Sequence, residues 1–149
     1  MSNRLSSLGH PPTGFVVQRM AKSGVEMLVG VVDDPQFGPV VACGAGGIQV
    51  ELLRDVSVRL TPLSNEDASD MIRELKTYPL LTGFRGSVPA DVTALEEGLL
   101  RVSAMVEDLP QIAELDCNPF VVHETGATIL DARIRVTAVE PRRLVGVRL

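Results

Sequence analysis

Three oxygen-bearing side chains, Glu114, Asp116 and Asn118, stand at alternate positions of one otherwise apolar stretch, residues 112–122. A period of two is typical of a β-strand with one face buried and the other open to solvent. Carboxylates in a row on the open face repel each other unless a positive charge lies over them. Pro119 has no backbone N–H, which favours an edge strand or the end of a strand. The pattern predicts a strand that could present oxygen ligands to a cation.

A second alternating stretch follows a turn at Glu124-Thr125, and the two stretches together predict a β-hairpin. A two-residue turn would set Asn118 opposite Asp131. The same register would set Asp116 opposite Arg133. Residues directly opposite each other in an antiparallel pair share a face, so this register would bring Asp131 to the other two oxygen donors.

The chemistry that suits these donors is magnesium binding. Mg²⁺ takes oxygen ligands, usually one or two carboxylates together with substrate phosphates and water. Asp116 and Asn118 lie two residues apart on one face, so both could reach one ion, and Asp131 would join them in the register above. The alternation alone favours a solvated outer face of a surface hairpin over a metal site, and both interpretations stay open at this point.

The composition is that of one soluble globular domain. The chain has 149 residues, of which 45% are hydrophobic and 22% charged, and this length supports a core. The net charge of −5 argues against a nucleic-acid surface, which needs a basic footprint. No apolar run approaches a membrane span and no signal-peptide core is present, so we expect a cytoplasmic protein without a membrane partner. Cys43 and Cys117 lie far apart and are expected as buried free thiols.

Hydrophobic periodicity places the remaining elements. The expected strands are residues 14–20, 25–32, 40–43, 55–60, 112–122 and 127–134. Two helices are expected: Ser64 caps the first, which Tyr78-Pro79 stops, and Asp91 caps the second. The side chains expected in the core include Val16, Leu28, Val41, Met71, Leu99, Leu115 and Ile134. The predicted fold class is α+β, a mainly antiparallel sheet with two helices packed on one face.

Several short motifs together resemble the nucleotide-binding part of the NDP-forming acyl-CoA synthetases, enzymes with the ATP-grasp fold. In chain order they are Gly24-Val25-Glu26, Phe37-Gly38-Pro39, Gly46-Gly47 with Glu51, Arg59 before Pro62-Leu63, Gly83-Phe84-Arg85-Gly86, Asp116-Cys117-Asn118-Pro119 and Asp131-Ala132-Arg133. No motif is decisive alone, but the combination is specific. From the residues themselves, the glycine run at 44–47 is expected to serve a tight turn or a close approach of backbones.

The resemblance assigns roles to individual residues. The backbone of Gln18, Arg19 and Met20 would bind the adenine edge, Glu26 the ribose hydroxyls, Asp116, Asn118 and Asp131 the Mg²⁺ ion, and Arg59 and Arg85 the phosphates of ATP or ADP. Without the resemblance, Glu26 would be interpreted as an exposed strand residue. For the two arginines, a surface salt bridge is the alternative.

The resemblance also implies partners. Residues 14–136 would form the C-terminal lobe of an ATP-grasp domain, between a poorly ordered arm (1–13) and a tail (137–149). The residues before Gly14 are too few for the opposing lobe, and neither His10 nor His123 resembles the phosphohistidine of the family. The expected partners are therefore the nucleotide, an N-terminal ATP-grasp lobe and a CoA-binding domain that carries the phosphohistidine.

The implied function is the Mg-ATP/ADP half-site of an ADP-forming acyl-CoA synthetase, which converts acyl-CoA, ADP and phosphate into acid, CoA and ATP. The chain alone is expected to be inactive because the opposing lobe is missing. Two other functions stay open. One is a non-catalytic regulatory or interaction domain, for example within an acetyltransferase fusion. The other is a lobe of an ATP-grasp carboxylate–amine ligase.

Overall fold

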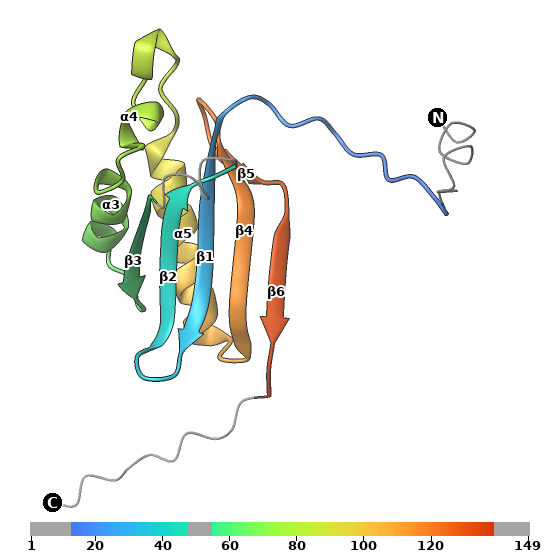
Figure 1. Ribbon diagram of the computed structural model, residues 1–149, viewed down its shortest axis with the longest axis vertical. Coiled ribbons are helices and arrows are strands. Elements are labelled where there is room, and N and C mark those ends of the chain that lie inside the picture. The colour runs from blue at the N-terminus through green and yellow to red at the C-terminus, as the bar shows by residue number, and fades with distance from the viewer. Residues whose placement is uncertain (1–12, 48–54, 139–149) are drawn as a thin grey trace, which may run out of the picture.

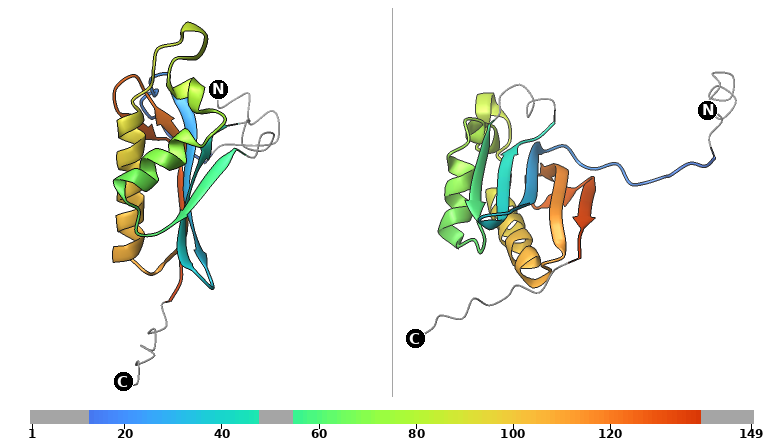
Figure 2. Two further views of the ribbon diagram at one scale, coloured as in Figure 1. Left: turned by 90° about the vertical axis from the view of Figure 1, so that its left-hand side faces the viewer. Right: turned by 60° about the horizontal axis from the view of Figure 1, so that its bottom comes forward.

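The computed structural model describes residues 13–47 and 55–138 and shows a layer of helices packed on one face of an antiparallel sheet (Figures 1 and 2). The elements are β1 (Val25–Asp34), β2 (Gly38–Ala45), β3 (Val56–Leu60), α3 (Asn65–Arg73), α4 (Tyr78–Leu81), the 3₁₀ turn η1 (Phe84–Gly86), α5 (Val92–Asp108), β4 (Ile112–Val122), β5 (Ala127–Ile129) and β6 (Ala132–Val136). The strand order is β3-β2-β1-β4-β5, and β6 also pairs with β4. The predicted α+β class is confirmed.

The sheet has an inner face, which the helices cover, and an outer face, which they leave open. The left view of Figure 2 shows the two layers from the side. Val29 on β1 lies opposite Cys43 on β2 and Cys117 on β4, and these three inner side chains are at most 3% exposed. On the outer face, Val32 lies between Val40 and Glu114. The core therefore lies between the sheet and α3 and α5.

The helices begin where the sequence predicts. The Ser64 side chain accepts a hydrogen bond from the Asp67 backbone N–H, and the Asp67 carboxylate accepts one from the Ser64 backbone N–H. This reciprocal capping box satisfies two N–H groups that the helix leaves free. The Asp91 carboxylate likewise accepts from the Ala94 N–H, at 3.1 Å, to cap α5. The sequence did not predict the short helix α4. Pro79, expected to end helical structure, stands instead in the first turn of α4, a position that proline tolerates.

A buried carboxylate fastens the start of β3 to the connection between α3 and α4. Asp55 is 6% exposed. Its two oxygens accept hydrogen bonds from the backbone N–H of Lys76 (2.9 Å), the backbone N–H of Thr77 (2.8 Å) and the Thr77 hydroxyl (2.6 Å). Three donors converge on one side chain, so Asp55 joins two segments that are about twenty residues apart in the chain.

The predicted strand at residues 14–20 is wrong. Among the described residues before β1, 13–24, there is no strand, and residues 13–20 run extended and exposed away from the sheet (Figure 1). Val16, predicted in the core, is 91% exposed. The hairpin that the sequence placed at 14–32 is instead formed by β1 and β2. β-Propensity describes how well a residue suits a paired and half-buried surface, and no neighbouring strand lies beside this segment.

The burial of the other residues predicted in the core depends on where in the sheet or the helices they lie. Val41, Met71, Leu99 and Leu115 are at most 4% exposed, as predicted. Leu28 is only half-buried, because it lies opposite Gly44 on the outer face. Ile134 is 53% exposed, although it points to the inner face opposite Leu115. It lies on the edge strand β6, which the helices do not reach.

Pro119 lies inside a central strand, against the expectation of an edge or a strand end. The register of β4 against β1 shifts between Met27 and Val29, so the Asn118-Pro119 pair opposes a single residue of β1. This is a β-bulge, one of the sites where a sheet tolerates proline. The bulge reverses the alternation of β4, because Cys117 and Phe120, three residues apart, are both buried.

Within the described parts of the chain, no helix is long and apolar enough to cross a bilayer.

Candidate functional site

The hairpin that carries the acidic residues has the register that a two-residue turn requires. The backbone N–H of His123 donates to the Gly126 carbonyl at 2.9 Å, so Glu124-Thr125 forms the tip. On β4, Val122 lies opposite Ala127 and, further down, Asp116 opposite Arg133. One register therefore holds from Val122 down to Glu114, and it shifts between Glu114 and Ile112.

Phe120 pairs with Ile129 and Cys117 with Ala132, so continuing the same register between these two pairs implies that Asn118 lies across from Asp131. The flanking pair, Cys117 and Ala132, lines the inner side of the sheet, so alternation sends Asn118 and Asp131 to the outer face with Asp116. Asp116 and Asp131 are exposed and Asn118 is half-buried. Three side chains with oxygen donors thus occupy neighbouring positions of one open surface.

Two arginines on β6 supply positive charge to this surface. An Arg135 guanidinium nitrogen lies 2.7 Å from a Glu114 carboxylate oxygen, and this hydrogen bond holds the pKa of Glu114 below its usual range. Arg133 Nε lies 3.9 Å from Asp131 Oδ2, and both side chains are well exposed. Glu114 is therefore already paired, whereas Asp131 has only a long and solvent-screened contact.

A second carboxylate stands at the start of β1. The backbone N–H of Gly46 donates to the Glu26 carbonyl at 2.8 Å. A Cβ atom added to Gly47 would lie 2.6 Å from Glu26 Oε2, and Gly47 has a φ of +64°. Only glycine combines this backbone conformation with such a close approach. The close backbone approach expected of the glycine run is therefore confirmed: the backbone at Gly47 lies against the exposed Glu26 carboxylate. Glu51, which completes the motif, lies outside the described residues.

The comparison with known families decides what this fold is. The family model of the ATP-grasp domain matches residues 1–136, most of the chain. The chain belongs to the ATP-grasp domain family.

Relatives of this ATP-grasp domain are ADP-forming ligases. It is 46% identical over 121 residues to the beta subunit of acetate–CoA ligase [ADP-forming] I from Pyrococcus furiosus, a match that covers 81% of this chain and 52% of the subunit. It is 45% identical over 123 residues to the 4-hydroxybutyrate–CoA ligase [ADP-forming] of Nitrosopumilus maritimus, covering 81% of this chain and 18% of the ligase. The chain thus spans about half the length, or less, of these curated relatives.

A solved structure shares the fold. It is the dinucleotide forming acetyl-coenzyme A synthetase 1 of Ca. Korarchaeum cryptofilum, in complex with coenzyme A and Mg-AMPPCP, with a phosphohistidine segment pointing towards the nucleotide binding site. The TM-score is 0.76 at 48% identity, and the match covers 78% of this chain and 55% of that one. The resemblance to the NDP-forming acyl-CoA synthetases is confirmed by these relatives.

The donor set of the ATP-grasp domain fits a magnesium ion. Asp116, Asn118 and Asp131 offer only carboxylate and carboxamide oxygens, the hard ligands that Mg²⁺ prefers. Among residues 13–47 and 55–138, no three His, Cys, Asp or Glu side chains lie close enough together to form a metal site. A site on the hairpin would therefore take its third protein oxygen from Asn118, and the remaining positions would go to phosphate and water.

The two arginines assigned to the phosphates lie away from the acidic hairpin. Arg59 lies opposite Val41, a buried inner residue, and its guanidinium contacts the Glu74 carboxylate at 2.5 Å. This ion pair is the alternative that the sequence left open for Arg59. Arg85 lies in η1 with a φ of 53°, and its guanidinium carbon stands 5.3 Å from the centre of the Phe84 ring.

The segment assigned to adenine is likewise apart from the sheet. Gln18, Arg19 and Met20 belong to the exposed segment before β1, and Met20 is 91% exposed. No described residue packs over them. In this chain the structure thus brings together Asp116, Asn118 and Asp131, but not the residues assigned to the base.

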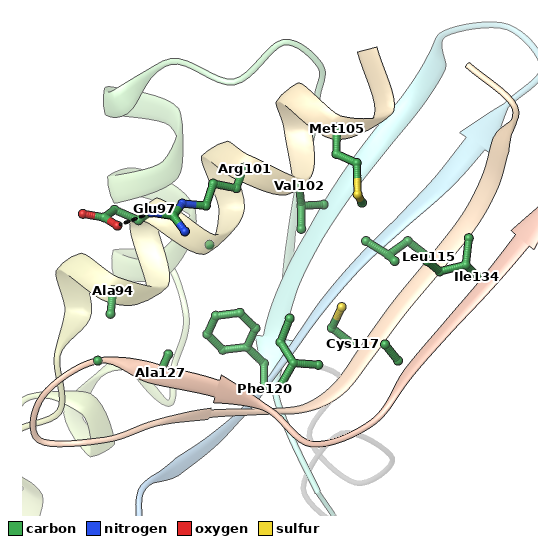
Figure 3. A pocket seen from close by; sticks show the side chains of 14 residues that line it. Ala94, Glu97, Arg101, Val102, Met105, Leu115, Cys117, Phe120, Ala127 and Ile134 are labelled. Atoms are coloured by element: carbon green, nitrogen blue, oxygen red, sulfur yellow. Dashed lines mark hydrogen bonds and ion pairs between the residues drawn. The ribbon is translucent and has the colours of Figure 1, made fainter. Parts of the chain in front are cut away.

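One feature that the sequence did not reveal is an open apolar groove of about 590 Å³ between α5 and the β4–β6 edge (Figure 3). Val102 and Met105 line it from α5, and Phe120 and Cys117 line it from β4. A Cβ atom on Gly98 would lie 2.6 Å from the Phe120 ring, so this glycine lets α5 approach the sheet. A glycine within an amphipathic helix was the available signal.

The two cysteines are expected to differ in reactivity. Cys43 is fully buried, and burial raises its pKa to about 12. Cys117 is 3% exposed, also has a pKa raised by burial, and lines the groove. The thiolate is the reactive form, so at pH 8 a small alkylating reagent should modify Cys117 slowly and Cys43 only after unfolding. Mass spectrometry of tryptic peptides checks this. Equal rates for the two thiols in the folded chain would contradict the buried position of Cys43.

Proposed function

We propose that this chain is the C-terminal ATP-grasp lobe that supplies the Mg-nucleotide half-site of an ADP-forming acyl-CoA synthetase. The observation that supports the proposal is the hairpin register, in which Asp116 pairs with Arg133 and Cys117 with Ala132, so that Asn118 and Asp131 are expected across from each other and beside Asp116. The similarity to ADP-forming CoA ligases supports the reaction class.

In this proposal the chain's own residues bind and orient the nucleotide. Asp116, Asn118 and Asp131 would hold Mg²⁺, which neutralises charge on the phosphates when it is bound. The Glu26 carboxylate can accept hydrogen bonds from two ribose hydroxyls at once. The backbone of Gly47 lies close to this carboxylate. Phosphoryl transfer requires positioning and charge neutralisation more than covalent chemistry from the protein. Arg85 and Arg59 remain candidates for phosphate contacts.

The exposed segment before β1 suits a position between two lobes. Phe15, Val16 and Val17 are 57%, 91% and 94% exposed. Burial of such apolar side chains against a partner surface is favourable, because it removes them from water. We propose that an N-terminal lobe covers them and that the backbone of residues 18–20 then meets the adenine edge. A CoA-binding domain that carries the phosphohistidine would complete the enzyme.

The 149-residue chain alone is expected to fold, to bind Mg-ADP weakly and to show no turnover, because in this proposal the nucleotide binds between this lobe and a second one. NMR titration with Mg-ADP should shift the amide signals of Glu26, Asn118 and Asp131. A coupled assay should detect no ADP-dependent release of CoA from acetyl-CoA. Shifts confined to the helix side of the sheet would contradict the site, and measurable turnover would contradict the need for a second lobe.

A chimera separates this function from the alternatives. In it, this chain replaces the matching 121 residues of the Pyrococcus furiosus beta subunit, and the native subunit is the control. ADP-dependent cleavage of acetyl-CoA would support the proposal. A folded chimera that binds Mg-ADP without turnover would indicate a regulatory domain, and turnover only with an amine acceptor would indicate a carboxylate–amine ligase.

A further inference from the structure

His123 joins four segments at the top of the sheet, although it belongs to none of the sequence motifs. It directly follows β4 and is 8% exposed. Its ring Nδ1 lies 3.0 Å from the Ser23 carbonyl oxygen, and its Nε2 lies 3.0 Å from the Thr128 hydroxyl on β5. Its own carbonyl accepts from the Asp91 N–H at 2.7 Å, at the start of α5. The side chain and backbone of His123 thus connect four segments: the entry to β1, β4, β5 and the start of α5.

The hydrogen-bond partners determine the tautomer of the His123 ring. A carbonyl oxygen can only accept, so Nδ1 must carry a proton toward Ser23. In the neutral ring Nε2 then accepts from the Thr128 hydroxyl, and in the charged ring it donates to the same oxygen. Both forms keep the bond to Ser23. The contact with Ser23 therefore requires the Nδ1–H tautomer of the neutral ring, and the charged ring keeps it as well.

This contact lies where the exposed segment meets the sheet. Residues 13–20 are fully exposed, and regular pairing begins at Val25, opposite Val122. Between them, Gly24 presses on the β4 backbone, since a Cβ there would lie 2.4 Å from the Val122 carbonyl oxygen. Beside this point, residues 22–25, 87, 88, 90 and 122–125 line a pocket of about 450 Å³. Ser23 itself is exposed, so its hydrogen bond to His123 is a specific contact that restrains it.

We propose that His123 is a positioning residue that anchors the root of the segment before β1 and so sets the direction in which Gln18, Arg19 and Met20 leave the sheet. This consequence for the nucleotide rests on the function proposed above. The anchor itself rests only on the contacts of His123 with Ser23 and Thr128.

Two variants separate the two ring nitrogens. His123→Asn places an amide N–H near the position of Nδ1 and can keep the bond to Ser23, whereas His123→Gln reaches only toward Thr128. Amide hydrogen exchange of the 149-residue chain is then followed at residues 22–25. We expect exchange there to accelerate by roughly five- to tenfold in His123→Gln, the effect of one lost hydrogen bond, and by less than about twofold in His123→Asn. Exchange at Val29 and Val31 in the centre of β1 is the internal control and should not change.

The outcomes are decisive in each direction. Equal exchange at residues 22–25 in the wild type and both variants, with Val29 and Val31 still protected, would overturn the anchor. Mg-ADP titration of the same proteins forms the second arm. Faster exchange together with unchanged Mg-ADP affinity would overturn the positioning role and leave the anchor. A wild-type chain that does not bind Mg-ADP would count against the proposed function, while the exchange data still judge the anchor.

Discussion

Asp55→Ala is expected to lower the free energy of unfolding by about 2–4 kcal/mol, because it removes a buried acceptor and leaves its three donors without a partner. The Asp55 carboxylate accepts from the N–H groups of Lys76 and Thr77 and from the Thr77 hydroxyl. Alanine removes all three acceptors and opens a small gap at a site that is 6% exposed. Urea unfolding followed by circular dichroism measures the change.

Two control variants accompany this measurement. Asp108→Ala, at the exposed end of α5, should change stability by no more than about 0.5 kcal/mol. Asp55→Asn keeps one acceptor oxygen and should give an intermediate loss. A loss at Asp55 no larger than at Asp108 would show that solvent replaces the three hydrogen bonds.

The same carboxylate predicts a pH dependence. Burial works against the charged form of Asp55, but the hydrogen bonds from the Thr77 side chain and from the two backbone N–H groups outweigh it and hold its pKa below the usual value. A lowered pKa in the folded state means that the stabilisation is complete above the unfolded pKa of about 3.9. It is lost as the pH falls through the folded pKa. The difference in stability between the wild type and Asp55→Asn should therefore be constant from about pH 5 to pH 7 and shrink below about pH 4.

The second large effect is expected at the proposed metal site. Asp131→Asn should weaken Mg-ADP binding by at least about tenfold, since losing even groups that only support metal ligands costs 10- to 100-fold. The substitution keeps the shape of an exposed side chain, so stability should change by no more than about 0.5 kcal/mol. Calorimetric titration with Mg-ADP, in the chimera described above, gives the affinity. The melting temperature of the same sample reports the fold.

A matched substitution tests whether position rather than charge alone is responsible. Asp108→Asn removes the same charge from the end of α5, and its Mg-ADP affinity should equal that of the wild type. Raising the Mg²⁺ concentration should recover part of the lost affinity of Asp131→Asn. If Asp131→Asn and Asp108→Asn bind Mg-ADP equally well, Asp131 is not a ligand and the hairpin face is an ordinary solvated surface.

The local patterns of the sequence predicted much of this fold because they depend on near neighbours. The alternation in β4, the capping box at Ser64 and the two-residue turn at Glu124-Thr125 are each specified within a few residues. The turn then fixed the register, and the register fixed which residue faces Asp131. The register of the acidic hairpin could therefore be predicted without a structure, whereas its role as a metal site stays a prediction.

What the sequence did not reveal depends on distant partners. Residues 14–20 have the composition of a strand but no strand beside them, so they remain unpaired. Ile134 alternates correctly, yet the helices stop short of β6 and leave it half exposed. The hydrogen bonds of His123 and Asp55 join segments that are far apart in the chain. No local pattern contains this information.

The pairing of β1 with β4 determines when this domain can begin to fold. Gly30 lies opposite Asp116, so the two central strands come from opposite ends of the described chain. A long loop must close before this pairing contributes any stability, and such non-local topologies fold slowly. During synthesis, the β1–β2 hairpin emerges first, and the edge of β1 that pairs with β4 stays unpaired until β4 leaves the ribosome. Pairing of the sheet is therefore completed by the segment that carries the acidic residues of the proposed metal site.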